Sequence, residues 1–142
     1  MFIKQLSVFI ENREGRLEEV LKTLKEKDIN IVSLSLADSS DYGMLRMVVA
    51  NPQGALSALK ESGFSAMLTD VLAVKLDHKA GQLQEVLDIV CKAGINVEYM
   101  YALATASDDA SIVFKASLPD KAVELLEKEG AKFLSAADIA AI

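Results

Sequence analysis

The chain repeats one segment of its own sequence, and this repeat constrains the fold more than any other feature. Residues 11–31, ENREGRLEEVLKTLKEKDINI, return as residues 77–97, DHKAGQLQEVLDIVCKAGINV, with an unbroken offset of 66 residues. Seven of the twenty-one positions are identical, where this composition would give about one or two by chance. The identical pairs are Gly15/Gly81, Leu17/Leu83, Glu19/Glu85, Val20/Val86, Leu21/Leu87, Ile29/Ile95 and Asn30/Asn96. The unit of structure is therefore about half the chain, and any site is present twice or built between the halves.

The first half predicts the order strand, helix, strand, strand, helix, strand. Residues 2–10 alternate in polarity like a strand, and the apolar residues that follow are spaced as one face of a helix. Residues 31–37 and 44–50 form a hairpin around a polar turn. A second helix begins after Asn51 with Pro52 in its first turn and ends at Gly63, and residues 64–71 form the last strand.

The second half predicts the same order. Its elements are a strand at 72–76, a helix at 81–93, strands at 97–104 and 111–117, a helix at 119–129 and a strand at 133–139. Pro119 and Gly130 match Pro52 and Gly63 at an offset of 67, so one residue is inserted in the turn at residues 105–110. The chain is thus expected to be α+β, with two tandem ferredoxin-like βαββαβ plaits, domains 1–70 and 71–142, whose helices cover one face of an antiparallel sheet.

Composition and charge exclude several classes of partner. The formal net charge is −6 without a cluster of basic residues, so the attraction to nucleic acid or to an anionic membrane is missing. The first ten residues lack the continuous apolar stretch of a signal peptide, and no transmembrane segment is predicted, so we expect a cytoplasmic protein. The single cysteine, Cys91, cannot form an internal disulfide, and its helical pattern predicts a packed side chain.

Residue types that support catalysis are scarce. A single histidine, His78, and a single cysteine exclude the usual heavy-metal clusters, and no phosphate-binding or nucleophile motif is present. The acidic turns at residues 38–41 and 108–109 lack the spacing of a calcium loop, which favours solvated turns. We therefore expect no metal, no cofactor and no enzymatic activity.

Two kinds of position remain as binding candidates. Each strand-to-helix loop ends in a glycine, and the next helix presents unpaired N–H groups that suit a carboxylate; alternatively, Gly15 and Gly81 only form the turn. Asn30 and Asn96 each stand between two aliphatic residues at the start of a strand, where an amide needs hydrogen-bond partners. The pattern does not decide between the turn's own backbone and a polar ligand.

With these residues the chain resembles the ACT domain, a small-molecule-sensing module attached to many enzymes of amino-acid metabolism. The resemblance rests on Asn-Arg-Glu-Gly-Arg-Leu after a strand, an amphipathic helix and then Asp-Ile-Asn-Ile, and it covers both halves without a catalytic domain. It implies an amino-acid ligand where two units meet, held by the loop of one and the asparagine of the other. By position, residues 12–17 would work with Asn96 and residues 78–83 with Asn30. The implied ligand-binding residues are Asn12, Arg13, Glu14, Gly15, Arg16, Leu17, Asn30, His78, Lys79, Ala80, Gly81, Gln82, Leu83 and Asn96.

The chain departs from the common ACT pattern at Glu14 and Ala80, where proline is frequent, and His78 stands opposite Asn12, so the two pockets would differ. The resulting hypothesis is a non-catalytic tandem ACT protein that binds a free amino acid between its repeats or between the chains of a homodimer, and that regulates a partner enzyme of amino-acid metabolism. Two alternatives remain open. One is a structural subunit that docks on such an enzyme without its own ligand, and the other is a small enzyme that uses His78.

Overall fold

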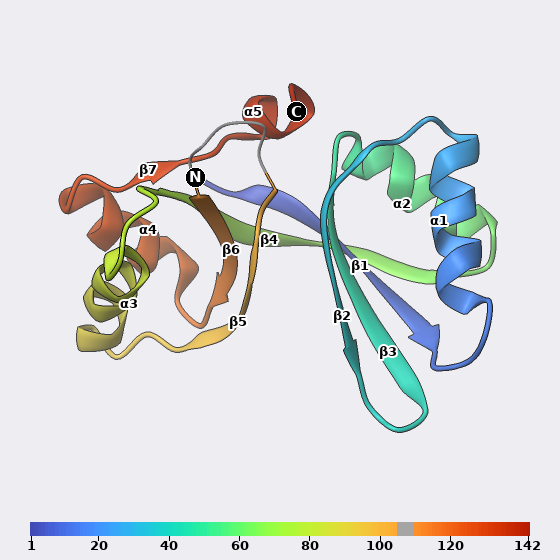
Figure 1. Ribbon diagram of the computed structural model, residues 1–142, viewed down its shortest axis with the longest axis horizontal. Coiled ribbons are helices and arrows are strands. Elements are labelled where there is room, and N and C mark those ends of the chain that lie inside the picture. Colours follow the sequence, from blue (N-terminus) through green and yellow to red (C-terminus); the bar gives the residue numbers. More distant parts are fainter. Residues whose placement is uncertain (105–109) are drawn as a thin grey trace. The chain divides into compact units, whose positions relative to one another are not determined.

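The computed structural model describes residues 1–104 and 110–142, which form two compact units (Figure 1). The unit called N-terminal below consists of Lys4–Thr69 and Ile139–Ile142, and the unit called C-terminal consists of Met1–Ile3 and Asp70–Asp138. The predicted domain bounds, 1–70 and 71–142, stay a prediction. The residue insertion expected in the turn at 105–110 and the acidic pair at 108–109 fall on the segment 105–109, outside the described residues.

In the N-terminal unit the elements follow in the predicted order. Strand β1 (Ile3–Glu11) leads to helix α1 (Arg16–Glu26), and the hairpin of β2 (Ile31–Asp38) and β3 (Tyr42–Val49) comes next. Helix α2 (Pro52–Glu61) then precedes the first part of β4 (Ser65–Leu76). The strand order is β2-β3-β1-β4, with β1 and β2 antiparallel to β3. Alternate strand residues and the apolar helix faces form one core, made of Leu6, Val8, Ile10, Val20, Leu24, Leu45, Met47, Val49, Ala55, Leu59 and Phe64.

The C-terminal unit repeats this arrangement. After the second part of β4 come helix α3 (Gln82–Lys92), strands β5 (Val97–Ala102) and β6 (Ala110–Ala116), helix α4 (Pro119–Lys128) and strand β7 (Lys132–Phe133). The strand order is β7-β4-β6-β5, with every described pairing antiparallel. Each unit therefore has the strand order of a ferredoxin-like plait, and the predicted α+β class is confirmed.

Strand β4 is continuous where the sequence predicted two strands, at 64–71 and 72–76. It is twelve residues long. Its residues up to Thr69 belong to the N-terminal unit, and those from Asp70 on belong to the C-terminal unit. No glycine or proline interrupts the segment, and Val71, Leu72 and Val74 are fully buried. A single strand therefore serves both units, as their last strand and their first strand respectively.

The last strand is shorter than predicted, because a helix begins where the strand was expected to continue. Strand β7 has two residues, and helix α5 (Ala136–Ala140) follows it. The Ser135 N–H and hydroxyl donate to Asp138 Oδ2 at 2.7 and 2.9 Å, and the Asp138 N–H donates to Ser135 Oγ at 3.2 Å. This reciprocal capping starts a helix, and the same donors lower the pKa of the Asp138 carboxyl.

The helices correct one prediction about Cys91. The Cys91 side chain is exposed, although its neighbour Val90 is buried in the core. Consecutive residues of a helix are rotated by about 100°, so a residue beside a core position points sideways or outward. Among the helices of the described residues, none is long and apolar enough to cross a membrane.

Candidate functional site

The loop that links β1 to α1 is fixed by short hydrogen bonds. The Asn12 N–H donates to the Asp41 carbonyl at 2.9 Å, and the Arg13 N–H donates to the Glu11 carbonyl at 2.9 Å. Arg13 Nε also donates to Glu11 Oε2 at 2.6 Å, and this hydrogen bond, together with the guanidinium charge, lowers the pKa of the Glu11 carboxyl. The loop backbone is therefore held in place, while the Asn12 side chain stays exposed.

Gly15 and Gly81 occupy the same backbone conformation at the entrances of α1 and α3. Their φ angles are 84° and 85°, in the left-handed region, where side chains other than glycine are strained. A Cβ atom at either position would meet nothing within 4 Å. Glycine is thus required by the backbone angle and not by a shortage of space. The space beside each glycine is open to a ligand.

The helices that follow these glycines begin without a side-chain cap. Neither α1 nor α3 has a side-chain hydrogen bond at its N-cap, whereas Asn51 Oδ1 accepts from the Gly54 N–H at 3.0 Å and caps α2. The first N–H groups of an α-helix have no acceptor inside the helix. Both loops therefore leave helix donors and the positive end of the helix dipole for a carboxylate.

The second loop lies in a hollow, and it is more favourable to an anion than the first. A hollow of about 360 Å³ is lined by five of the predicted residues, namely His78, Lys79, Ala80, Gln82 and Leu83. Within residues 1–104 and 110–142, Lys79 has no ion-pair partner, whereas its counterpart Arg13 is paired with Glu11. The first turn of α3 carries one carboxylate, and that of α1 carries two.

Arg16 of the first loop is engaged within its own unit. Its Nη1 lies 2.5 Å from Glu19 Oε2, and its guanidinium carbon lies 4.5 Å from the centre of the Phe64 ring. A cation over an aromatic face is attracted by the ring electrons. The predicted ligand-binding role of Arg16 therefore competes with contacts that already hold it.

Asn30 and Asn96 are tied to their sheets through the backbone, not through their amides. The Asn30 carbonyl accepts from the Ala50 N–H at 3.0 Å, and the Asn96 carbonyl accepts from the Ser117 N–H at 2.9 Å. The Asn96 N–H donates to Ser117 Oγ at 2.9 Å. Both side chains are exposed, and Asn30 lines a hollow of about 390 Å³ at the end of α1. The amides therefore remain available to a ligand.

Within one unit, the loop and the asparagine lie at opposite ends of the sheet. Glu11 pairs with Tyr42 and Ile31 pairs with Val49, so the two ends are seven positions apart on β3, which is about 24 Å. In the other unit, Leu76 pairs with Ala110 and Val97 pairs with Ala116, which gives about 20 Å. A unit cannot bring its own loop and asparagine onto one small ligand. The predicted pairing of each loop with the asparagine of the other repeat stays a prediction.

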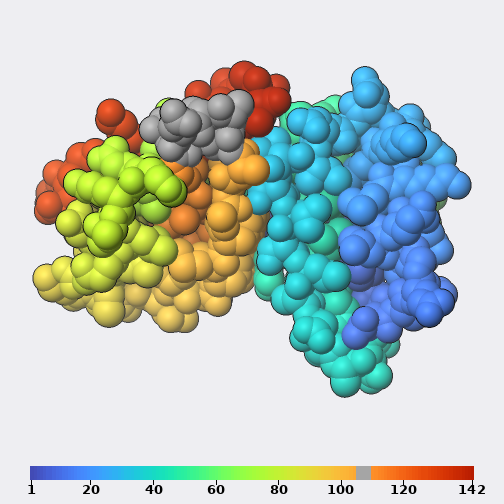
Figure 2. All heavy atoms as spheres, in the orientation of Figure 1, coloured from blue at the N-terminus to red at the C-terminus, as the bar shows by residue number. Residues whose placement is uncertain are grey.

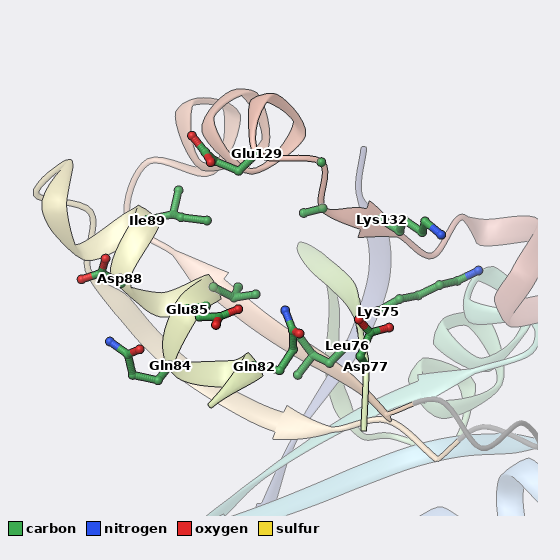
Figure 3. Close-up of a pocket in the computed structure, with 13 residues that line it drawn as sticks. Lys75, Leu76, Asp77, Gln82, Gln84, Glu85, Asp88, Ile89, Glu129 and Lys132 are labelled. Atoms are coloured by element: carbon green, nitrogen blue, oxygen red, sulfur yellow. The ribbon is translucent and has the colours of Figure 1, made fainter. Parts of the chain in front are cut away.

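The sequence missed a second hollow of the C-terminal unit, a cavity of about 600 Å³ beside α3 (Figure 3). It lies between the end of β4, helix α3 and the connection from α4 to β7. Of the predicted residues, only Gln82 lines it. A difference between the repeats, Phe64 against Ala131, was the available signal.

The described residues show no cluster that could hold a metal ion. His78 is exposed, and no group of three or more His, Cys, Asp and Glu residues within 1–104 and 110–142 is placed to hold a metal ion. The two helix N-termini offer hydrogen-bond donors and positive charge, which suit the binding of an anionic group.

Comparisons with known proteins agree with this reading of the fold. A family model described as "ACT domain pair" matches residues 1–142. Protein BT0572 from Bacteroides thetaiotaomicron is 37% identical, with a TM-score of 0.93 over 100% of this chain and 98% of that one. The regulatory subunit of aspartate kinase from Thermus thermophilus, in a ligand-free form, is 21% identical, with a TM-score of 0.61 over 88% of this chain and 91% of that one. The corresponding subunit from Thermus flavus is also 21% identical, with a TM-score of 0.60 over 88% of this chain and 90% of that one. At that identity the likeness concerns the fold. A search of curated proteins found no match.

Proposed function

Because the chain belongs to the ACT domain pair family, we propose that it is a non-catalytic regulatory protein that binds a free amino acid where ACT units meet, within one chain or between two. ACT domain pairs are typical of amino-acid-sensing regulatory modules. One observation carries the proposal: in both units a left-handed glycine opens onto a helix start that no side chain caps.

These groups suit the two charges of an amino acid. The helix N–H groups would bind the carboxylate, and amide or loop carbonyl oxygens would accept from the ammonium group. Asn30 and Asn96 have exposed amides for this purpose. We propose that the loop at 78–83 with Asn30 is the stronger site, because its loop is hollowed and carries the unpaired Lys79. The loop at 12–17 with Asn96 would be the weaker site.

We also propose that binding changes the association of a cytoplasmic homodimer or its contact with a partner enzyme of amino-acid metabolism. A ligand regulates only through a difference in affinity for two states. Support for association comes from β2, an edge strand of its unit and part of the cyan surface in Figure 2. Its residues Leu34 and Leu36 are 46% and 47% exposed, and an exposed apolar edge strand can pair with another strand.

A thermal-shift screen of the twenty amino acids tests the proposal, because a ligand at one hundred times its Kd stabilises by about 2.7 kcal/mol. The affinity of a hit is then measured for His78→Ala with Asn30→Ala, and for Asn12→Ala with Asn96→Ala as the matched pair at the other site. We expect at least a tenfold loss for the first pair and a smaller loss for the second. Unchanged affinity in both pairs would show that the ligand binds elsewhere.

The docking subunit without its own ligand is the second candidate, favoured by the exposed Leu34 and Leu36. It predicts no amino-acid-dependent rise in melting temperature. Replacement of both leucines by lysine should then abolish partner binding while the melting profile with each amino acid stays flat.

A further inference from the structure

The cavity beside α3 is a formed hollow with an apolar floor and polar walls. Leu76 and Val86 are 7% and 5% exposed and belong to the core beneath it. Figure 3 shows Gln82 and Glu85 directed toward the open space, with Lys75 and Lys132 extending away from Glu85. The cavity thus offers apolar contact beside the Glu85 carboxylate.

In the N-terminal unit the same place is filled by side chains of the protein. Arg16 stacks on the Phe64 ring at 4.5 Å and pairs with Glu19 at 2.5 Å. Phe64 is 7% exposed and belongs to the core of its unit. We call these three residues, Arg16, Glu19 and Phe64, the internal plug.

Hydrogen bonds establish which residues of the C-terminal unit stand where the plug stands. The Glu19 N–H donates to the Gly15 carbonyl and the Glu85 N–H to the Gly81 carbonyl, both at 3.0 Å. Arg16 and Gln82 each directly follow one of these glycines.

The ring position follows from the ends of the second helices. The Phe64 N–H donates to the Leu59 carbonyl at 2.9 Å, and the Ala131 N–H donates to the Leu126 carbonyl at 3.0 Å. Each residue follows a left-handed glycine, Gly63 or Gly130. Ala131 therefore occupies the position of Phe64.

The C-terminal unit shares one member of the plug and differs at the other two. Glu85 retains the carboxylate of Glu19, while Gln82 replaces the guanidinium and Ala131 replaces the ring. The remaining hollow is lined by Gln82, Glu85 and Ala131 together. Among the described residues that line it, carboxylates outnumber ammonium groups by four to two. Compared with the N-terminal unit, the cavity thus lacks the cation and the ring and has the carboxylate that accepts from the cation.

We propose that this cavity binds a small organic cation in which an amidinium or guanidinium group is joined to a flat apolar body. The cationic group pairs with the Glu85 carboxylate, which can accept two parallel N–H donors. The flat body lies over Ala131, in the space that Phe64 fills in the other unit. This binding goes beyond the amino-acid site and uses a carboxylate outside the two loops.

Benzamidine is the probe, because it carries an amidinium on a ring, and the neutral benzamide has almost the same shape. Binding to the full chain is measured by calorimetry and by NMR shift changes. We expect benzamidine to bind with shifts centred on α3 and the α4–β7 connection, and benzamide to bind at least tenfold more weakly. Equal binding of the two, or no binding of benzamidine, would overturn the proposal.

Three variants locate the site. Ala131→Phe restores the ring and should abolish benzamidine binding, and Glu85→Gln should weaken it about tenfold. The matched control Glu19→Gln, in the N-terminal unit, should leave it unchanged. Circular dichroism checks the folding of each variant. If Ala131→Phe does not fold, Glu85→Gln alone still tests whether the carboxylate binds the amidinium group. Amino-acid binding is also measured on Glu85→Gln, to separate this cavity from the loop site. If the two sites are distinct, this variant loses benzamidine binding and keeps amino-acid binding.

Discussion

The start of α1 and the start of α3 have nearly the same backbone and different chemistry. At α1 the glycine φ is 84°, and Arg16, Glu19 and Phe64 close the space beside the helix. At α3 the glycine φ is 85°, and a cavity of about 600 Å³ stands beside the helix. The shared glycines and apolar helix faces thus specify the framework, and residues that differ decide what the surface can bind.

The largest test of this comparison is Phe64→Ala, which opens the internal plug. Removing a buried phenylalanine costs about 3 to 5 kcal/mol, from lost burial and the cavity left behind. We expect a loss of about 3 kcal/mol in the free energy of unfolding, measured with urea. The control is Phe133→Ala, because Phe133 is only partly buried and its loss should be smaller. A cost below about 1 kcal/mol for Phe64→Ala would mean that the plug contributes little.

A smaller test compares the caps of α2 and α4. Asn51 caps α2 with φ −130° and ψ 83°, and Leu118 begins α4 with φ −128° and ψ 77° but no side-chain cap. Asn51→Ala should destabilise by about 1 kcal/mol, and Leu118→Asn should stabilise by up to about 1 kcal/mol. Both are read from urea midpoints. An unchanged midpoint for Leu118→Asn would show that equal backbone angles do not suffice for the cap.

The smallest effect concerns the first loop. The hydrogen bond from Arg13 and its charge lower the folded pKa of Glu11 from its ordinary value, so the carboxylate's contribution to stability is present above the unfolded pKa and is lost as the pH falls through the folded pKa. NMR titration should give a Glu11 pKa below the ordinary value for glutamate, and Arg13→Ala should raise it toward that value. A Glu11 pKa that does not change in Arg13→Ala would show that this hydrogen bond and charge do not set it.

Much of the fold followed from the sequence, because helix faces and hairpins depend on local spacing. The spacing of Leu17, Val20, Leu21 and Leu24 predicts α1, and their counterparts predict α3. The short last strand was missed because the capping by Ser135 and Asp138 outweighs an apolar pattern.

Only part of the candidate site could be predicted from the sequence. The loop glycines stood out by repetition, and the structure added that Asn30 and Asn96 use their backbones and not their amides in the turn. The sequence offered one signal for the cavity, Ala131 in place of Phe64, but it did not show that Gln82 and Ala131, far apart in sequence, line one space. Helical and strand periods do not report such proximity.

Strand β4 limits where this chain can gain or lose residues. One residue added inside β4 would turn every later side chain of the strand to the opposite face, and its buried residues Val71, Leu72 and Val74 serve one unit while its beginning serves the other. The offset between the repeats is 66 residues before the second hairpin and 67 after it, so the two halves differ in length outside β4. The junction between the units therefore tolerates no change of length without turning buried side chains of β4 outward.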